Sequence, residues 1–288
     1  MPMRCWQRCG SKLVFMGGIE FLKGHGTQND FVVLPDAEAR LELDERRVAA
    51  LCDRRRGLGA DGVLRVVRPA ALGVDSGAAW FMDYRNADGS IAEMCGNGVR
   101  LFARYLAVSG LTGPEPFLVG TRAGDRRVTV HPDGSSTVEM GPASVTGASV
   151  TRVGGRDFSG IAVDVGNPHL VAFTDEDIAG LDLTRQPRYD ADLFTDGVNL
   201  EFVNTVAPDR IRMRVHERGV GETRACGTGT VAAAAAMLHT AGSDAGYCIV
   251  EIPGGTVTVT LQPDGTMLTG PAEFVAHGEL DETWWAAQ

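Results

Sequence analysis

Alternating hydrophobic and polar positions recur along the chain, and this spacing is typical of β-strands with one buried face. Residues 128–130 and 257–261 show the pattern clearly, and each segment leads into a Pro-Asp-Gly turn, at 132–134 and 263–265. Most of the chain is therefore predicted to form short strands joined by tight turns.

Helical spacing is confined to a few places, and two of them stand out. Val99, Phe102, Ala103 and Leu106 follow one another at i, i+3, i+4 and i+7, and Ser109-Gly110 ends the pattern. Residues 231–238 are apolar on every side, which predicts a helix that is buried all round.

The two halves of the sequence resemble each other at an almost constant offset. Met94-Cys95-Gly96-Asn97-Gly98 corresponds to Ala225-Cys226-Gly227-Thr228-Gly229 at an offset of 131. Further pairs in the same order are Asp61-Gly62-Val63 with Asp196-Gly197-Val198, Asn86 with Glu217, Gly124 with Gly255, and the two Pro-Asp-Gly turns. Several matches in one order indicate an internal duplication.

The duplication predicts an α+β fold of two similar domains, each a mostly antiparallel, barrel-like sheet around one central buried helix. We expect the first domain at 18–140 and the second at 141–272, with Gly141-Pro142 at the boundary. The tail, 273–288, can pack back on the first domain. Residues 1–17 lie outside the duplicated unit and are predicted to be a leader without a functional role.

The composition and charge of the chain disfavour several classes of function. The 288 residues include 37 acids and 27 bases, for a net charge of −10, which disfavours binding to nucleic acid or to an anionic membrane. No apolar run reaches the length of a membrane helix, and residues 1–17 lack the long apolar core of a signal peptide. We therefore expect a cytoplasmic protein whose partner is a small molecule.

The cysteines and histidines do not suggest a metal site. Six cysteines are too few for a disulfide scaffold, there is no Cys-x-x-Cys, and the six histidines form no close pair. Only Lys12 and Lys23 could form a Schiff base. Cys52 lies in a helical pattern and Cys248 in a strand-like one, so both are interpreted as buried apolar residues.

Cys95 and Cys226 differ because each lies at the predicted N-terminus of a buried helix, with a glycine directly after it. Free amide groups there favour a thiolate and can also hold a carboxylate. If the duplicated domains face each other, one thiol lies on each side of a bound molecule. A thiolate on one face and a thiol on the other could remove a proton from carbon and return one to the opposite face, which inverts a stereocentre.

Seven motifs along residues 19–280 resemble those of the diaminopimelate epimerase family. The two strongest are the cysteine segments 94–100 and 221–229. The others are Lys23-Gly24-His25-Gly26-Thr27-Gln28-Asn29-Asp30-Phe31, Asp83-Tyr84-Arg85-Asn86-Ala87-Asp88-Gly89-Ser90, Gly166-Asn167-Pro168-His169, Gly197-Val198-Asn199 and His216-Glu217-Arg218-Gly219.

The resemblance implies an isomerase of lysine and peptidoglycan precursor biosynthesis that converts LL-2,6-diaminoheptanedioate to the meso form without cofactor or metal. It implies Cys95 and Cys226 as the acid/base pair, with His169 and Glu217 orienting the reacting groups. The implied substrate-binding residues are Asn29, Asn86, Gly96, Asn97, Asn167, Asn199, Glu217, Arg218, Gly227 and Thr228. It also implies a homodimer. The chain departs from the family at Gly62, where many members carry Gln.

Three other functions explain part of the pattern. A proline racemase-type enzyme would share both cysteines but need no contacts for a second amino-acid end. A thiol redox or binding protein would use the cysteines as a reversible pair. A Cys-His hydrolase could use His25 or His169 as base, but would not explain why the cysteine is duplicated.

Overall fold

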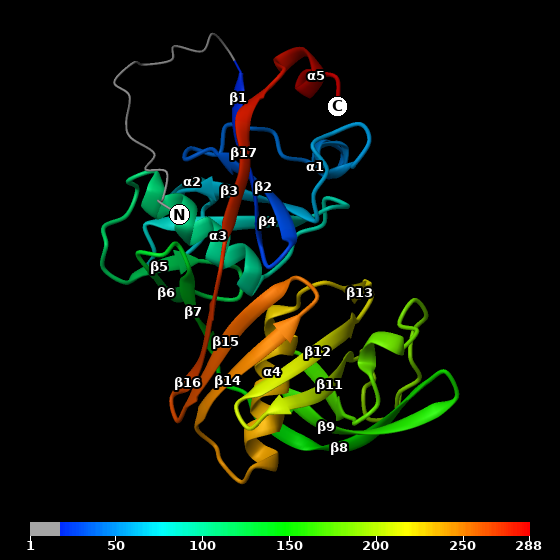
Figure 1. Ribbon diagram of the computed structural model, residues 1–288. Helices are drawn as coiled ribbons and strands as arrows, with labels where there is room; N and C mark the ends of the chain where they lie inside the picture. The colour runs from blue at the N-terminus through cyan, green and yellow to red at the C-terminus, as the bar shows by residue number, and fades with distance from the viewer. Residues whose placement is uncertain (1–17) are drawn as a thin grey trace, which may run out of the picture.

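The computed structural model describes residues 18–288, so the predicted leader lies outside the described residues. The chain forms two lobes, each with one long helix surrounded by strands (Figure 1). This arrangement confirms the α+β fold and the duplication predicted from the sequence.

In the first lobe, seven strands follow one another along the chain as neighbours in the sheet. They are β1 Ile19–Gly26, β2 Asn29–Pro35, β3 Gly62–Val67, β4 Trp80–Asn86, β5 Phe117–Gly120, β6 Arg126–Val130 and β7 Ser136–Gly141. The pairs β2–β3 and β4–β5 are parallel and the other neighbouring pairs are antiparallel. The short helices α1 Glu45–Cys52 and α2 Pro69–Leu72 lie in the connections between strands.

The second lobe repeats this pairing. Its strands are β8 Ser144–Val153, β9 Arg156–Asp164, β10 Pro168–Phe173, β11 Asn199–Ala207, β12 Arg210–Glu217, β13 Gly221–Thr223, β14 Gly246–Ile252, β15 Gly255–Gln262 and β16 Gly265–Gly270. The pairs β10–β11 and β12–β14 are parallel, at the positions that β2–β3 and β4–β5 occupy in the first lobe. A short 3-10 helix, η1 Ile178–Gly180, lies between β10 and β11. Mostly antiparallel pairing is thus confirmed, with two parallel pairs in each half.

A long helix fills the centre of each lobe. The first, α3, spans Gly96–Val108 and buries the apolar positions predicted for it, and the second, α4, spans Gly227–Thr240 and is buried on nearly every side. Side chains from both helices and both lobes join one continuous hydrophobic cluster. Cys52 on α1 and Cys248 on β14 are buried in the apolar interior, as predicted.

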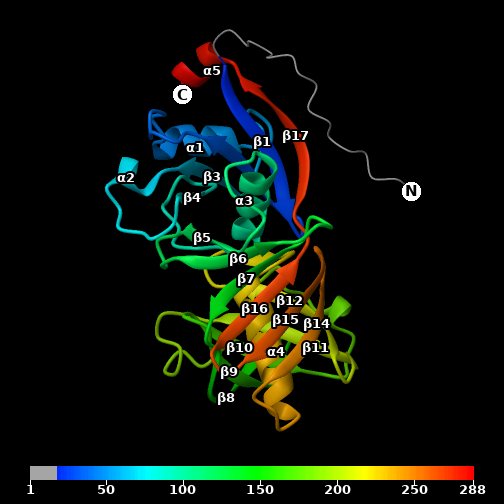
Figure 2. The ribbon, with the colours of Figure 1, turned by 90° about the vertical axis from the view of Figure 1, so that its left-hand side faces the viewer.

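The lobes are connected through their strands as well as by the chain. Strand β7 of the first lobe pairs antiparallel with β16 of the second, so one ladder runs through both. After β16 the chain returns to the first lobe as β17, Glu273–Leu280, which pairs antiparallel with β1 (Figure 2). The chain ends in α5, Glu282–Ala286. Among residues 18–288, no helix is long and apolar enough to span a membrane.

Candidate active site

The candidate site lies where the N-termini of α3 and α4 meet. Cys95 is the residue that caps α3, and Cys226 caps α4, each with extended backbone before the helix begins. The first residues of the two helices almost touch, because a Cβ at Gly227 would lie 3.4 Å from the Cα of Gly96. Glycine at both positions therefore permits the approach that brings the two cysteine-bearing turns together.

The Cys95 thiol is held by a chain of amides. Its Sγ donates a hydrogen bond of 3.4 Å to Oδ1 of Asn29, the first residue of β2. That oxygen also accepts a hydrogen bond of 3.2 Å from Nδ2 of Asn97, which in turn donates to the backbone oxygen of Ala225, at 3.3 Å. Asn97 thus contacts Asn29, the residue beside the Cys95 thiol, and Ala225, the residue before Cys226, and so bridges the two halves of the site.

The Cys226 thiol is held by the first turn of its own helix. The backbone N–H of Gly229 donates to Sγ over 3.4 Å, and the Thr228 hydroxyl lies 3.6 Å from it. Asn167 donates to that hydroxyl, at 3.4 Å. Asn29 and Asn167, which correspond in the duplication, therefore approach the two cysteine turns from equivalent strand connections.

His169 is fully buried and has two fixed partners. Its Nδ1 lies 2.7 Å from Oε1 of Glu201, and its Nε2 lies 3.0 Å from Oδ1 of Asn167. Burial raises the pKa of Glu201, while the charge and hydrogen bond of His169 act in the opposite direction. Since Asn167 reaches Thr228, the histidine is connected to the α4 turn through one side chain.

Glu201 is a site residue that the sequence analysis missed. It is fully buried on β11, and a Cβ at Gly229 would lie 2.6 Å from its Oε1. Its position was visible in the sequence, because a single acid interrupts the apolar run Leu200–Val203 two residues after Asn199. Such an acid in a buried strand needs a partner, and the sequence does not show that His169 is that partner.

Glu217 is the last residue of β12, and Arg218 follows it. Thr223 donates a short hydrogen bond to Glu217, whose charge acts on both thiols. The Arg218 backbone N–H donates to Oδ1 of Asn199, at 3.0 Å, and Nη1 of Arg218 donates to the oxygen of Asp196, at 2.9 Å. Asn199 also donates to Pro168, so its amide connects three loops of the second lobe.

Asn86 occupies the position in the first lobe that Glu217 has in the second. Its side chain donates 3.0 Å to Ser90 Oγ, within its own turn, and does not join the amide chain around Cys95. Beside it, Gly62 pairs with Asn86 across β3 and β4. A Cβ at Gly62 would lie 2.5 Å from the Arg85 carbonyl oxygen, so this chain leaves no room there for the glutamine of other family members.

The thiols of Cys95 and Cys226 are less acidic than the sequence analysis predicted. Helix N-termini were expected to favour thiolates, yet the pKa of Cys95 is raised and that of Cys226 is raised well above its ordinary value. The main cause is burial, which disfavours the charged form, and Glu217 adds repulsion at both. Backbone amides of Asn97 and Gly98 at Cys95, and of Gly229 at Cys226, act in the opposite direction but are outweighed.

Both cysteines are free thiols, and within residues 18–288 no group of three or more His, Cys, Asp or Glu side chains is arranged to hold a metal ion. The site offers two free thiols at adjoining helix N-termini, together with amide and charged side chains from both lobes.

Solved structures with the same fold include several epimerases and racemases. A hydroxyproline epimerase from Agrobacterium vitis aligns with a TM-score of 0.67 at 17% identity, over 91% of this chain and 92% of its own. A predicted epimerase from Pseudomonas aeruginosa aligns with a TM-score of 0.67 at 14% identity, over 91% and 99%. At such low sequence identities the likeness establishes the fold alone, and this chain has the same two-lobed fold as these proteins.

The sequence comparisons establish the family. The diaminopimelate epimerase family model matches residues 21–146 and 161–275. Diaminopimelate epimerase from Mycolicibacterium smegmatis is 55% identical over 93% of this chain and 98% of its own, and that from Rhodococcus opacus is 53% identical over 93% and 99%. The chain belongs to the diaminopimelate epimerase family, which confirms the resemblance noted in its motifs. It is therefore an isomerase that acts on an amino acid.

Proposed function

We propose that this protein inverts one stereocentre of LL-2,6-diaminoheptanedioate to give the meso form, with Cys95 and Cys226 as the acid/base pair. The observation that carries the proposal is the meeting of two cysteine-capped helix N-termini, one from each lobe, at Gly96 and Gly227. Family membership, and the relatives named diaminopimelate epimerase, support the choice of substrate.

In this mechanism one cysteine, as thiolate, takes the proton from Cα and becomes a thiol. The other, as thiol, gives its proton to the opposite face and becomes the thiolate, so atoms and charge balance in each turnover. The raised pKa of both thiols keeps the proton-donating cysteine protonated near neutral pH. Because the raised pKa also disfavours the thiolate, the site must stabilise the single thiolate that begins each cycle.

The carboxylate beside the reacting carbon would gain charge as the proton leaves. Backbone N–H groups at the starts of α3 and α4, at Gly96 and Asn97 and at Gly227 and Thr228, would stabilise it, because the first turn of a helix leaves such donors without partners in the helix. The N–H of Asn97 also interacts with the Cys95 thiol. Each donor of this kind contributes roughly 3 kcal/mol in other enzymes. No protein group in this scheme requires a cofactor, and we propose that the enzyme works without one.

The distal amino-acid end would be bound by Asn86, Asn167, Asn199, Glu217 and Arg218. A guanidinium pairs with a carboxylate and a carboxylate with an ammonium group, so Arg218 and Glu217 match the two charges of that end. His169, held between Glu201 and Asn167, would fix the orientation of Asn167 at the α4 turn. We further propose that the enzyme acts in the cytoplasm as a homodimer.

The test is deuterium incorporation at Cα of LL-diaminopimelate in deuterated water, with formation of the meso isomer followed in parallel. The intact protein should show both, and Cys95→Ser and Cys226→Ser should each reduce epimerisation by several orders of magnitude, because serine is a far weaker acid. Cys52→Ser, which alters a buried thiol outside the site, is the matched control and should retain turnover.

Substantial epimerisation by either serine variant would contradict the two-thiol mechanism. Turnover of L-proline in place of diaminopimelate would instead identify a racemase of the proline type. An intact protein that exchanges no α-proton from either substrate would contradict both functions.

A further inference from the structure

Arg100 is a fully buried cation without an acidic partner. It lies on α3 just over one turn after Cys95, and its side chain is 0% exposed. Among residues 18–288 it forms no ion pair, and its Nη1 has no hydrogen-bond partner. A buried, unpaired guanidinium is costly, so its presence calls for a function that outweighs this cost.

The fold forms a specific cradle for this guanidinium. Nη2 donates to Thr27 Oγ1 and to Asn97 Oδ1, each at 3.0 Å, and Nε donates to the oxygen of Pro271, at 3.3 Å. Glycines leave the space for it, since a Cβ at Gly26 or at Gly270 would lie 3.2 or 3.3 Å from its nitrogens. Arg100 therefore joins the β1–β2 turn, the start of α3 and the segment between β16 and β17.

One of these contacts leads directly to Cys95. Because Arg100 donates to Oδ1 of Asn97, the Nδ2 of Asn97 points to Oδ1 of Asn29, the same oxygen that lies beside the Cys95 thiol. The other side of the Asn29 amide is fixed too, because its Nδ2 donates to Asp61 at 2.8 Å. The side-chain amides of Asn97 and Asn29 are thus each held in one orientation, and together they connect Arg100 to the Cys95 thiol.

The internal duplication supplies a comparison for this position. The residue that corresponds to Arg100 at the offset of 131 is Val231, which is fully buried at the same place on α4. A buried apolar side chain therefore satisfies the packing of a helix at this point. Arg100 is therefore a difference between the two halves, and it lies in the half that carries Cys95.

The charges around the two thiols are correspondingly unequal. Cys95 is affected by Arg100, which favours its thiolate, and by Glu217, which opposes it, while the buried phenol of Tyr84 on β4 lies close enough to interact with it. Two acids, Glu217 and Glu201, both oppose the thiolate of Cys226. Both cysteines occupy the N-cap position of a helix, and Cys95 has the more positive surroundings of the two.

We propose that Arg100 is a positioning residue for the Cys95 half of the site. It fixes the Asn97–Asn29 amide pair, whose oxygen accepts the hydrogen bond of the Cys95 thiol. Its positive charge acts against that preference for the thiol and makes Cys95 the cysteine that more readily carries the thiolate. The inference rests on the proposed function, in which one thiolate begins each cycle. Arg100 itself does not contact the reacting carbon in this scheme.

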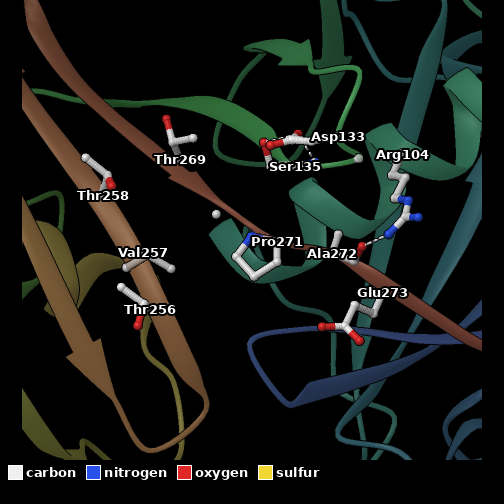
Figure 3. Close-up of a pocket in the computed structure, with 12 residues that line it drawn as sticks. Arg104, Asp133, Ser135, Thr256, Val257, Thr258, Thr269, Pro271, Ala272 and Glu273 are labelled. Atoms are coloured by element: carbon white, nitrogen blue, oxygen red, sulfur yellow. Dashed lines mark hydrogen bonds between the residues drawn. The ribbon is translucent and has the colours of Figure 1, made fainter. Parts of the chain in front are cut away.

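The experiment compares Arg100→Met and Arg100→Lys with Arg104→Met as the matched control. Arg104 lies one turn further along α3 and donates to the oxygen of Ala272. It lines a cavity of about 440 Å³ that residues of both lobes form and whose lining includes neither cysteine (Figure 3). For each protein, alkylation by iodoacetamide is measured against pH with peptide mapping, so that Cys95 and Cys226 are followed in the same digest. Values of kcat and KM for LL-diaminopimelate are measured alongside.

For Arg100→Met we expect the midpoint of Cys95 alkylation to rise by about one pH unit. At any pH below the midpoint, the thiolate fraction of Cys95 then falls about tenfold. The midpoint of Cys226 alkylation should stay unchanged. The kcat should fall by about tenfold or more, with a smaller change in KM. Arg100→Lys keeps the charge, so its Cys95 midpoint should stay near that of the intact protein. Its kcat should still fall, because an ammonium group cannot bond Thr27, Asn97 and Pro271 together.

The inference would be overturned if Arg100→Met kept the alkylation midpoints and the kcat of the intact protein, or if both cysteines shifted equally. It would also be overturned if Arg104→Met raised the Cys95 midpoint as Arg100→Met is expected to do. If Arg100→Met does not fold, Arg100→Lys decides, and a wild-type kcat in that variant would overturn it. Failure of the proposed function itself is distinguishable, since Cys95→Ser would then retain turnover whatever the Arg100 variants do.

Discussion

At the scale of single residues, the side chains of Asn199 and Arg218 in the second lobe are both held by backbone groups. Both ends of the Asn199 amide bind backbone groups, of Pro168 and of Arg218. Arg218 uses one side-chain nitrogen for the oxygen of Asp196, and a guanidinium has five N–H donors, so most of them remain available. This arrangement holds the Arg218 side chain in place while its free edge can meet a carboxylate.

We therefore expect Arg218→Lys to bind substrate weakly although the charge is kept. A lysine ammonium lacks the planar pair of donors that a carboxylate accepts, and the loss should raise KM about tenfold, or ~1.4 kcal/mol, with a smaller effect on kcat. Steady-state kinetics with LL-diaminopimelate is the measurement. Arg212→Lys, on β12 and in an ion pair with Glu251 of β14, should behave as the intact protein. An unchanged KM in Arg218→Lys would place distal recognition elsewhere.

At the scale of elements, the two central helices begin in the same way but are packed differently at their third residue. A Cβ at Gly98 of α3 would meet Leu64 at 3.3 Å, a distance that a small shift can accommodate. A Cβ at the corresponding Gly229 of α4 would lie 2.6 Å from Glu201, which His169 holds in place. The second helix therefore has the stricter requirement for glycine.

Gly229→Ala should consequently cost stability and turnover, and Gly98→Ala should cost little. Alanine favours a helix by up to about 1 kcal/mol over glycine, which offsets mild crowding at Gly98. At Gly229 the crowding and the displaced Glu201 should outweigh this gain and leave a net loss of roughly 1–2 kcal/mol. Urea unfolding and kcat of the two variants measure the difference, and equal losses would show that the Glu201–His169 pair does not depend on α4.

At the scale of the whole molecule, burial of the thiols makes stability depend on pH. The pKa values of Cys52 and Cys248 are raised to about 12 by burial, and those of Cys95 and Cys226 are raised as well. Below the ordinary thiol pKa both the native and the unfolded chain keep these protons. Above it the unfolded chain loses protons that the native chain retains, so unfolding becomes more favourable.

The free energy of unfolding should therefore fall as pH rises from about 8.5, the ordinary thiol pKa, toward about 10. Each buried thiol can contribute a slope of up to about 1.4 kcal/mol per pH unit. Arg100, whose pKa burial lowers to about 10, acts in the opposite sense only at the upper end of this range. Urea midpoints across the range test this, and Cys248→Ala should have a shallower slope than the intact protein. A flat or rising profile would contradict it.

The sequence by itself determined the duplicated fold and the position of one cysteine at the start of each central helix, because both depend on local patterns. Alternation predicted the strands, the apolar spacing predicted α3 and α4, and repeated Cys-Gly segments placed one thiol at the start of each helix. Apolar periodicity reports which face of an element is buried, so an internal repeat of that pattern is visible without any contact being known.

Only the tertiary structure decided what lies opposite those faces. It brought Glu201 to His169, left Arg100 without an acid beside Cys95, and paired β17 with β1 across the length of the chain. It also reversed the expected acidity of the thiols, because the helix amides are local but the desolvation that outweighs them comes from both lobes together. Such effects depend on residues distant in sequence, and neither spacing nor composition records them.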